Sequence, residues 1–391
     1  MKRPSHQGAR PNIRISEPES NFAPGGYTSH NMNVRHALAL LSLPVLAAQA
    51  TYNPRADLDE GRYLKALSEA EIRIKQNPGD ALAWAAKSQA LVALMRFGEA
   101  GAAAQKSLEL KRDLADGLLA RGLARAGTAI RERNFSSLQG ASSAMDDFRA
   151  ATQADPKLAS AWMSLGLAYE QLPGLLGGST KRALVCAEKL RKVSPSRGDL
   201  LQGMVLSMDG RWNDAKGYFL RALSVAPGDP EIVYGYLDSL GSRTTRKSLG
   251  EGPQRAQCAA EAMRLLPSIK GHSRGIQAIC DALLDGGNPE GSWKVAYDAL
   301  NQCDLPSLIK VQLGKIAARA GIHREEGLAY LDQALKEPLE GGTGGIATVQ
   351  WRRGQILKDL NRKDEARQAA QAALRVDPKH PGAKRLLEDL K

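Results

Sequence analysis

Histidine is the side chain best suited to proton transfer near neutral pH, and the 391-residue chain contains six of them. They are widely separated along the sequence: His6, His30, His36, His272, His323 and His380. No His-Glu-x-x-His pattern places two imidazoles on one helix face for zinc, and no Gly-x-Ser-x-Gly surrounds a nucleophile. The sequence therefore predicts a non-enzymatic protein without a metal site or cofactor.

A glycine-rich turn at Gly177 to Lys181 is the one local candidate for phosphate binding, because glycines before a helix expose backbone N–H groups. The segment lacks the Gly-x4-Gly-Lys spacing of a phosphate loop, and no strand precedes it. We favour the other interpretation, in which Ser179 or Thr180 caps the following helix.

Four cysteines, Cys186, Cys258, Cys280 and Cys303, fall in expected helices without the close spacing of a metal or redox motif. Buried free thiols packing as small apolar groups are the favoured interpretation. A disulfide between Cys280 and either Cys258 or Cys303 is the alternative, since an even count in an exported chain permits one.

Alanine is followed by proline twelve residues later at five places, and in several of them alanine or phenylalanine recurs four and seven residues after the first alanine. The segments are 66–78, 144–156, 183–195, 215–227 and 366–378. Spacings of four and seven put these side chains on one helical stripe, and the proline ends the helix beyond its last turn. Repetition of this unit predicts a solenoid.

Trp162, Leu165, Gly166 and Tyr169 precede Ala183 in the order expected of a first helix. Together these residues resemble the tetratricopeptide repeat, whose pattern is W-x2-L-G-x2-Y, then A-x3-F, then P. The resemblance covers most of residues 57–391 and implies an all-α fold, a right-handed solenoid of antiparallel helix pairs forming a superhelix. Gly354, Leu357 and Ala366 begin a last unit in the same register.

The N-terminus has a different character. Residues 1–31 are polar and aperiodic, and we expect a disordered extension that is not translated if Met32 is the true start. Residues 32–50 combine a short basic start, an apolar run at Ala37–Ala47 and a small-x-small site, which is typical of a secretory signal peptide. The expected location is therefore the periplasm, as for exported bacterial proteins of this family; a first helix of the array at Val34–Ala50 is the alternative.

Residues 51–340 are predicted to form repeats with a degenerate middle, and residues 346–391 a last repeat pair with a capping helix. The expected helices include Asp57–Gln76 as a lone first helix, a basic linker at Gly241–Gly252, and Pro381–Leu390 as the cap. Two insertions interrupt the pattern. Thr128–Ser143 predicts either an extended helix or a projecting loop, and Leu172–Ser179 a second loop.

In tetratricopeptide arrays the first helices line the concave face, so the resemblance assigns peptide-binding positions to this chain. One group is apolar and rich in methionine, and the other is basic with an aromatic side chain. The assigned residues are Met163, Leu167, Met204, Met208, Lys315, Arg319, Trp351, Arg352 and Gln355. No first helix supplies the asparagine of the clamp that grips chaperone tails, which disfavours such tails as ligands.

We expect a protein-binding scaffold of the cell envelope that takes a protein or peptide segment on its concave face. A small-ligand module of solute uptake, with the two insertions lining a pocket, is the alternative. The net charge of +12 also permits association with a membrane surface, but few aromatic residues lie among the basic ones, so no nucleic-acid partner is expected. The sequence does not predict the oligomeric state.

Overall fold

The computed structural model describes residues 54–132, 135–269 and 271–391, and every regular element in these ranges is a helix. The predicted all-α fold class is confirmed. The expected extension at 1–31 and signal peptide at 32–50 lie outside the described residues. Across the described ranges, no helix combines the length and the apolar composition needed to cross a membrane.

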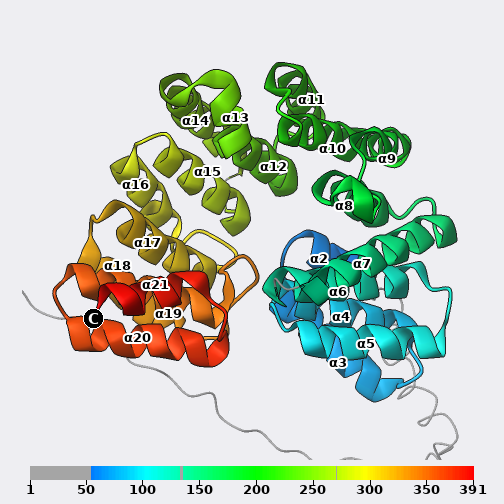
Figure 1. Cartoon of the computed structure of the whole chain (residues 1–391), viewed down its shortest axis with the longest axis horizontal. Coiled ribbons are helices and arrows are strands. Elements are labelled where there is room, and N and C mark those ends of the chain that lie inside the picture. The colour runs from blue at the N-terminus through cyan, green and yellow to red at the C-terminus, as the bar shows by residue number, and fades with distance from the viewer. Residues whose placement is uncertain (1–53, 133–134, 270) are drawn as a thin grey trace, which may run out of the picture. The chain divides into compact units, whose positions relative to one another are not determined.

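Most helices form pairs joined by short turns (Figure 1). The first helices are α4 (Ala81–Ala93), α6 (Ala115–Glu132), α8 (Ala159–Gln171), α10 (Pro195–Met208), α12 (Pro230–Gly241), α15 (Ser273–Asp285), α17 (Pro306–Ala320) and α19 (Gly345–Asp359). The second helices are α5 (Phe97–Leu110), α7 (Phe135–Ala154), α9 (Thr180–Val193), α11 (Trp212–Val225), α14 (Glu251–Leu265), α16 (Pro289–Ala299), α18 (Arg324–Ala334) and α20 (Lys363–Val376). Each first helix contacts its own second helix and the next first helix, as in a solenoid. We call the surface formed by successive first helices the first-helix face.

Short helices complete the array. They are α2 (Pro54–Asp59) and α3 (Tyr63–Gln76) at the start, the 3-10 turns Gly174–Leu176 and Leu266–Ile269, α13 (Arg243–Leu249), and α21 (Pro381–Asp389) at the end. Helix α21 packs against both α19 and α20. It buries Ala383 and Leu386 on one side and exposes a polar side.

Small residues at matching places in the first helices explain why the pairs pack closely. A Cβ atom on Gly203 of α10 would lie only 3.0 Å from the ring of Phe219, and one on Gly314 of α17 would collide with Leu331. At the matching place in α4, the buried hydroxyl of Ser88 donates to the carbonyl of Ala100 at 2.8 Å. Larger side chains there would separate the helices of a pair.

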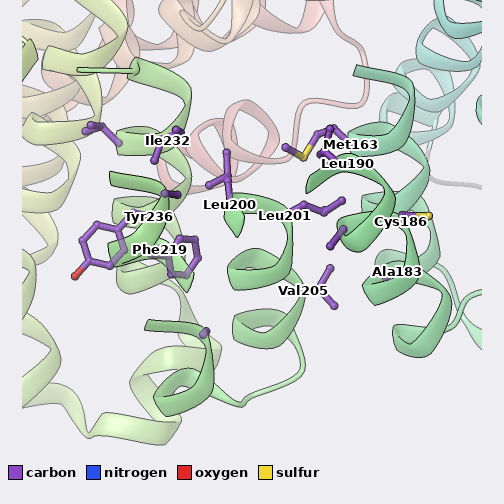
Figure 2. Packing of buried hydrophobic residues seen from close by; sticks show 14 of the residues in the cluster. Met163, Ala183, Cys186, Leu190, Leu200, Leu201, Val205, Phe219, Ile232 and Tyr236 are labelled. Carbon is purple, nitrogen blue, oxygen red and sulfur yellow. The ribbon is translucent and has the colours of Figure 1, made fainter. Parts of the chain in front are cut away.

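The alanine and aromatic stripes predicted from the sequence form the core. Ala183, Ala215 and Phe219 are fully buried, and the cluster continues across several pairs (Figure 2). The ring of Phe219 lies 5.3 Å from that of Tyr236, and both contact Trp212. Large side chains from second helices therefore fill the space left by small residues in first helices.

Two of the predicted elements were wrong in detail. The single helix Asp57–Gln76 is two helices, because the chain turns at Gly61, whose φ of +77° is available to glycine but strained for other residues. The predicted linker Gly241–Gly252 contains helix α13, whose first turn is capped by Ser242 accepting from the Thr245 amide.

The insertion at Thr128–Ser143 is accommodated by longer helices. Helix α6 has 18 residues and α7 has 20, and they pack together along their length. The extended-helix alternative is therefore the one observed.

Helix α3 also contacts a loop that lies far away in the sequence. The Leu64 amide donates to both carboxylate oxygens of Glu340 at 3.2 Å, and Arg274 stacks over and hydrogen-bonds Tyr63. Glu340 is only 5% exposed. We call this the Glu340 contact; it joins the start of the array to the loop between α18 and α19.

Candidate functional site

All nine predicted binding residues lie on first helices. Met163 and Leu167 are on α8, Met204 and Met208 on α10, and the five polar or aromatic residues on α17 and α19. Each pair of neighbouring first helices in these groups is in contact, so each group forms a continuous part of the first-helix face.

The apolar group is largely committed to packing. Met163 is buried (Figure 2). Leu167 and Met204 are half-buried and pack against the core. Met208, at the end of α10, is 37% exposed. Met208, and the half-buried Leu167 and Met204 in part, can present an apolar surface to a partner without repacking.

The basic group is mostly neutralised by carboxylates of the preceding first helix. Lys315 Nζ lies 2.7 Å from Asp281 Oδ2, and Arg319 Nη2 lies 2.9 Å from Asp285 Oδ1. The expectation of a simply basic surface is therefore wrong here, because Asp281 and Asp285 on α15 were missed. Both pairs span 34 residues, one repeat length, and that offset was the signal available in the sequence.

Arg352 differs from these two residues. It forms no ion pair with any described carboxylate; Nη1 donates to Gln355 Oε1 at 3.2 Å, and the guanidinium carbon lies 4.3 Å from the centroid of the Trp351 ring. Burial, assisted by the positive charge of Arg319, lowers the pKa of Arg352 to about 10. An anionic group would relieve this desolvated charge.

Trp351 also has a structural role that the sequence did not predict. Its ring packs against Gly382 and lies 5.3 Å from the His380 ring. The ring nitrogen Nδ1 of His380 accepts a hydrogen bond from the Ala383 amide and so caps the start of α21. Trp351 therefore helps to hold the capping helix, whatever it binds.

A cavity of about 310 Å³ opens on the first-helix face near Met163. Its lining combines apolar and polar side chains from seven helices: Leu58, Asp59, Tyr63, Gln89, Val92, Ala93, Leu123, Ala159, Ser160, Met163, Ser164, Arg197 and Glu231. Arg197 Nη2 pairs with Glu231 Oε2 at 3.1 Å. Burial raises the pKa of Glu231, and the charges of Asp229 and Asp59 raise it further.

A second cavity, of about 290 Å³, lies between α5, α6 and α7. The first insertion contributes Thr128, Glu132, Ser137 and Gly140 to its lining. Its arginines are already satisfied, because Arg121 and Arg125 both bind the buried carboxylate of Asp147. The insertion Leu172–Ser179 lines neither cavity.

The remaining chemical candidates have structural roles. Ser179 is the N-cap of α9 and accepts from the Arg182 amide, as favoured for the glycine-rich turn. All four cysteines are free. No group of three or more histidine, cysteine or acidic residues suited to a metal occurs among the residues that the structure describes.

Comparisons with known proteins bear on the family. Residues 347–380 match the family model described as tetratricopeptide repeat. No curated protein matches the sequence. Similar solved structures include a thermophilic tetratricopeptide protein, TTC0263, from Thermus thermophilus, which is 20% identical, with 53% of this chain and 96% of that chain covered and a TM-score of 0.40.

Two further structures are similar at the same level. A tetratricopeptide repeat protein from Parabacteroides merdae ATCC 43184 is 13% identical, covers 78% of this chain and 96% of its own, and has a TM-score of 0.39. Pseudomonas aeruginosa pilF is 15% identical, with 59% of this chain and 97% of that chain covered and a TM-score of 0.36. At these scores no property of these proteins is transferred to this chain.

The helix pairs, the small residues between them and the charged first-helix face define an α-solenoid. The segment at 347–380 matches the tetratricopeptide repeat, and the helix pairs that precede it are arranged in the same kind of solenoid. Such repeats generally form non-enzymatic scaffolds for protein–protein interactions.

Proposed function

We propose that this protein is a scaffold of the cell envelope that binds a protein segment along its first-helix face, the concave face of a tetratricopeptide superhelix. The observation that carries the proposal is Arg352. It is a partly buried cation on that face, without a carboxylate partner among the described residues, beside the exposed part of Trp351.

The partner segment carries an acidic side chain that binds Arg352. Lys315 and Arg319 lie on the adjacent helix α17, but Asp281 and Asp285 already occupy them. Met208 and Met204 supply an adaptable apolar contact further along the face.

The test begins with a photo-crosslinking amino acid at Gln355, in cells, and a second one at Arg375 on the outer helix α20. A partner captured from Gln355 and not from Arg375 is then purified, and its affinity is measured with Arg352→Gln. Loss of one member of a desolvated charged pair costs about 2 kcal/mol or more, so binding should weaken at least about 30-fold.

Arg375→Gln is the matched control, because it removes the same charge from an exposed position on α20. That variant should bind as the wild type does. Equal affinity of the wild type and Arg352→Gln would remove Arg352 from the binding surface. Trp351 is left intact in this experiment because it packs against α21.

The cell-envelope location is supported by the sequence of residues 32–50, which has the three parts of a signal peptide. Fractionation followed by N-terminal sequencing tests it. A periplasmic chain that begins near Thr51 is the expected result, and a cytoplasmic chain that retains residues 32–50 would contradict it.

A small-ligand module remains a second candidate, favoured by the cavity of about 290 Å³ beside the insertion at Thr128–Ser143. Its test is protection of peptides from α6 and α7 against hydrogen exchange when a periplasmic small-molecule extract is added. Unchanged exchange in both helices would exclude this cavity as the ligand site.

A further inference from the structure

The cavity near Met163 has an apolar wall and a charged end. Leu58, Val92, Leu123 and Met163 line it together with the carboxylates of Asp59 and Glu231. A concave site of this size, with a few polar groups among apolar ones, fits a short chain that carries one polar head. The charges at its end decide which head it accepts.

Arg197, the arginine that lines the cavity, already forms an ion pair. Arg197 pairs with Glu231, and the nearby Arg55 binds the carboxylate of Asp116 with both Nε and Nη2. Arg274, on α15, is engaged with Tyr63. None of these cations therefore offers an unoccupied site for an anion.

The carboxylate of Asp59, in contrast, has no cationic partner among the described residues. Asp59 is the last residue of α2 and lines the cavity, and its carboxylate makes no hydrogen bond or ion pair with any residue that the structure describes. Asp59 is an exposed residue at the mouth of the lining, open to solvent and to a ligand. Protein atoms around it nevertheless raise its pKa, and the charge of Asp229 adds to this effect.

Asp229 does not compensate Asp59. Its carboxylate accepts from the amides of Glu231 and Ile232 and is used in capping the start of α12. Arg197 and Arg55 attract Asp59 from a distance but remain in their own pairs. The charged end of the cavity thus has more carboxylates than cations.

We propose that this cavity binds an alkyl chain ending in a cation, an alkylguanidinium or alkylammonium group, with the head on Asp59 and the chain against Leu58, Val92 and Met163. The group belongs either to a lysine or arginine side chain of a protein or to a free amine. The cation pairs with a carboxylate that has no ion-pair partner among the described residues, and it favours the ionised form of Asp59. Because bound cation favours ionised Asp59, affinity rises with pH through the raised pKa and then becomes constant.

The test uses methyl-¹³C methionine in the full chain and n-butylguanidinium as the probe. The Met163 methyl signal, assigned with Met163→Leu, should shift and saturate, whereas that of the exposed Met263 on α14 should not. Sodium butyrate and 1-butanol, which carry an anionic and a neutral head, should produce no saturating shift. Equal binding of butyrate would overturn the proposal.

Asp59→Asn should weaken butylguanidinium binding at least fivefold while the other methionine signals stay in place. The matched control is Asp364→Asn, since Asp364 is a 90% exposed carboxylate on α20. Binding to Asp59→Asn as tight as to the wild type would refute the role of Asp59.

A peptide of sequence Ala-Arg-Ala with blocked ends separates the two sources of the cation. Both sources support the proposal: tighter binding of the peptide assigns the site to a protein side chain, and tighter binding of butylguanidinium assigns it to a free amine. The inference stands apart from the proposed partner site, because Arg352→Gln should leave the Met163 shift unchanged. A failure at either site is therefore distinguishable from a failure at the other.

Discussion

The Glu340 contact provides the sharpest test of how the array is held together. Helix α3 begins at Tyr63, so the Leu64 amide is one of the N–H groups that have no partner within the helix. Both oxygens of Glu340 accept from it, and one also accepts from Gly341 at 3.3 Å. Glu340→Ala removes these acceptors and leaves the amide facing a gap.

The expected cost follows from the type of hydrogen bond. A bond to a charged group contributes about 1.5–3 kcal/mol, so we expect Glu340→Ala to weaken the contact by about 2 kcal/mol. That corresponds to about a 30-fold larger population of the open form. Glu340→Gln keeps one acceptor oxygen without a charge and should cost less.

Hydrogen exchange of peptides from 63–76 measures this opening directly. Their amides should exchange about 30-fold faster in Glu340→Ala. Glu337→Ala, which removes a 43% exposed carboxylate from the same loop, should leave them unchanged. Identical exchange in the wild type and Glu340→Ala would refute the contact as a source of stability.

The contact also has a predicted pH dependence. Burial raises the pKa of Glu340, although the Leu64, Gly341 and Tyr63 amides and Arg274 oppose this shift. A carboxyl whose pKa is raised in the folded state stabilises it fully below the unfolded value, near 4.5, and this stabilisation is lost as pH rises through the raised pKa. Glu340→Gln should remove that dependence when variants are compared at equal pH.

Two other predictions concern the core. Phe219→Ala removes a fully buried ring that packs against both Trp212 and Tyr236, and it should cost about 3–5 kcal/mol in urea denaturation, with faster exchange centred on α10 to α12. An unchanged midpoint would contradict this prediction. Iodoacetamide should modify the half-buried Cys303 before Cys280, which is fully buried, as read by mass spectrometry of the native chain. Faster labelling of Cys280 would mean that α15 opens readily.

The sequence predicted the helix pairs well because their signals are local. Alanine and phenylalanine at fixed spacings in α11 specify a buried stripe, and proline at 227 ends the unit. The same reasoning failed at Gly61, since a single positive φ divides an otherwise continuous helical pattern. It also failed for α13, where the glycines and basic residues suggested a linker.

The site was less predictable because its chemistry depends on neighbours in other repeats. Lys315 and Arg319 were expected to be available, yet their partners lie one repeat earlier, on a helix with only part of the motif. Asp59 was not considered at all. Its importance comes from α10 and α12, which lie more than 130 residues later in the chain and complete the cavity.

The two ion pairs between α15 and α17 also bear on the elasticity of the array. Partly exposed ion pairs contribute roughly 0.2–1 kcal/mol each, which is close to thermal energy. The two pairs therefore restrain adjacent repeats only weakly and can open and re-form. A ligand whose carboxylates displace Asp281 and Asp285 would break both ion pairs. The equilibrium distance between α15 and α17 would then change. Stiffness and occupancy of this face are therefore governed by the same four side chains.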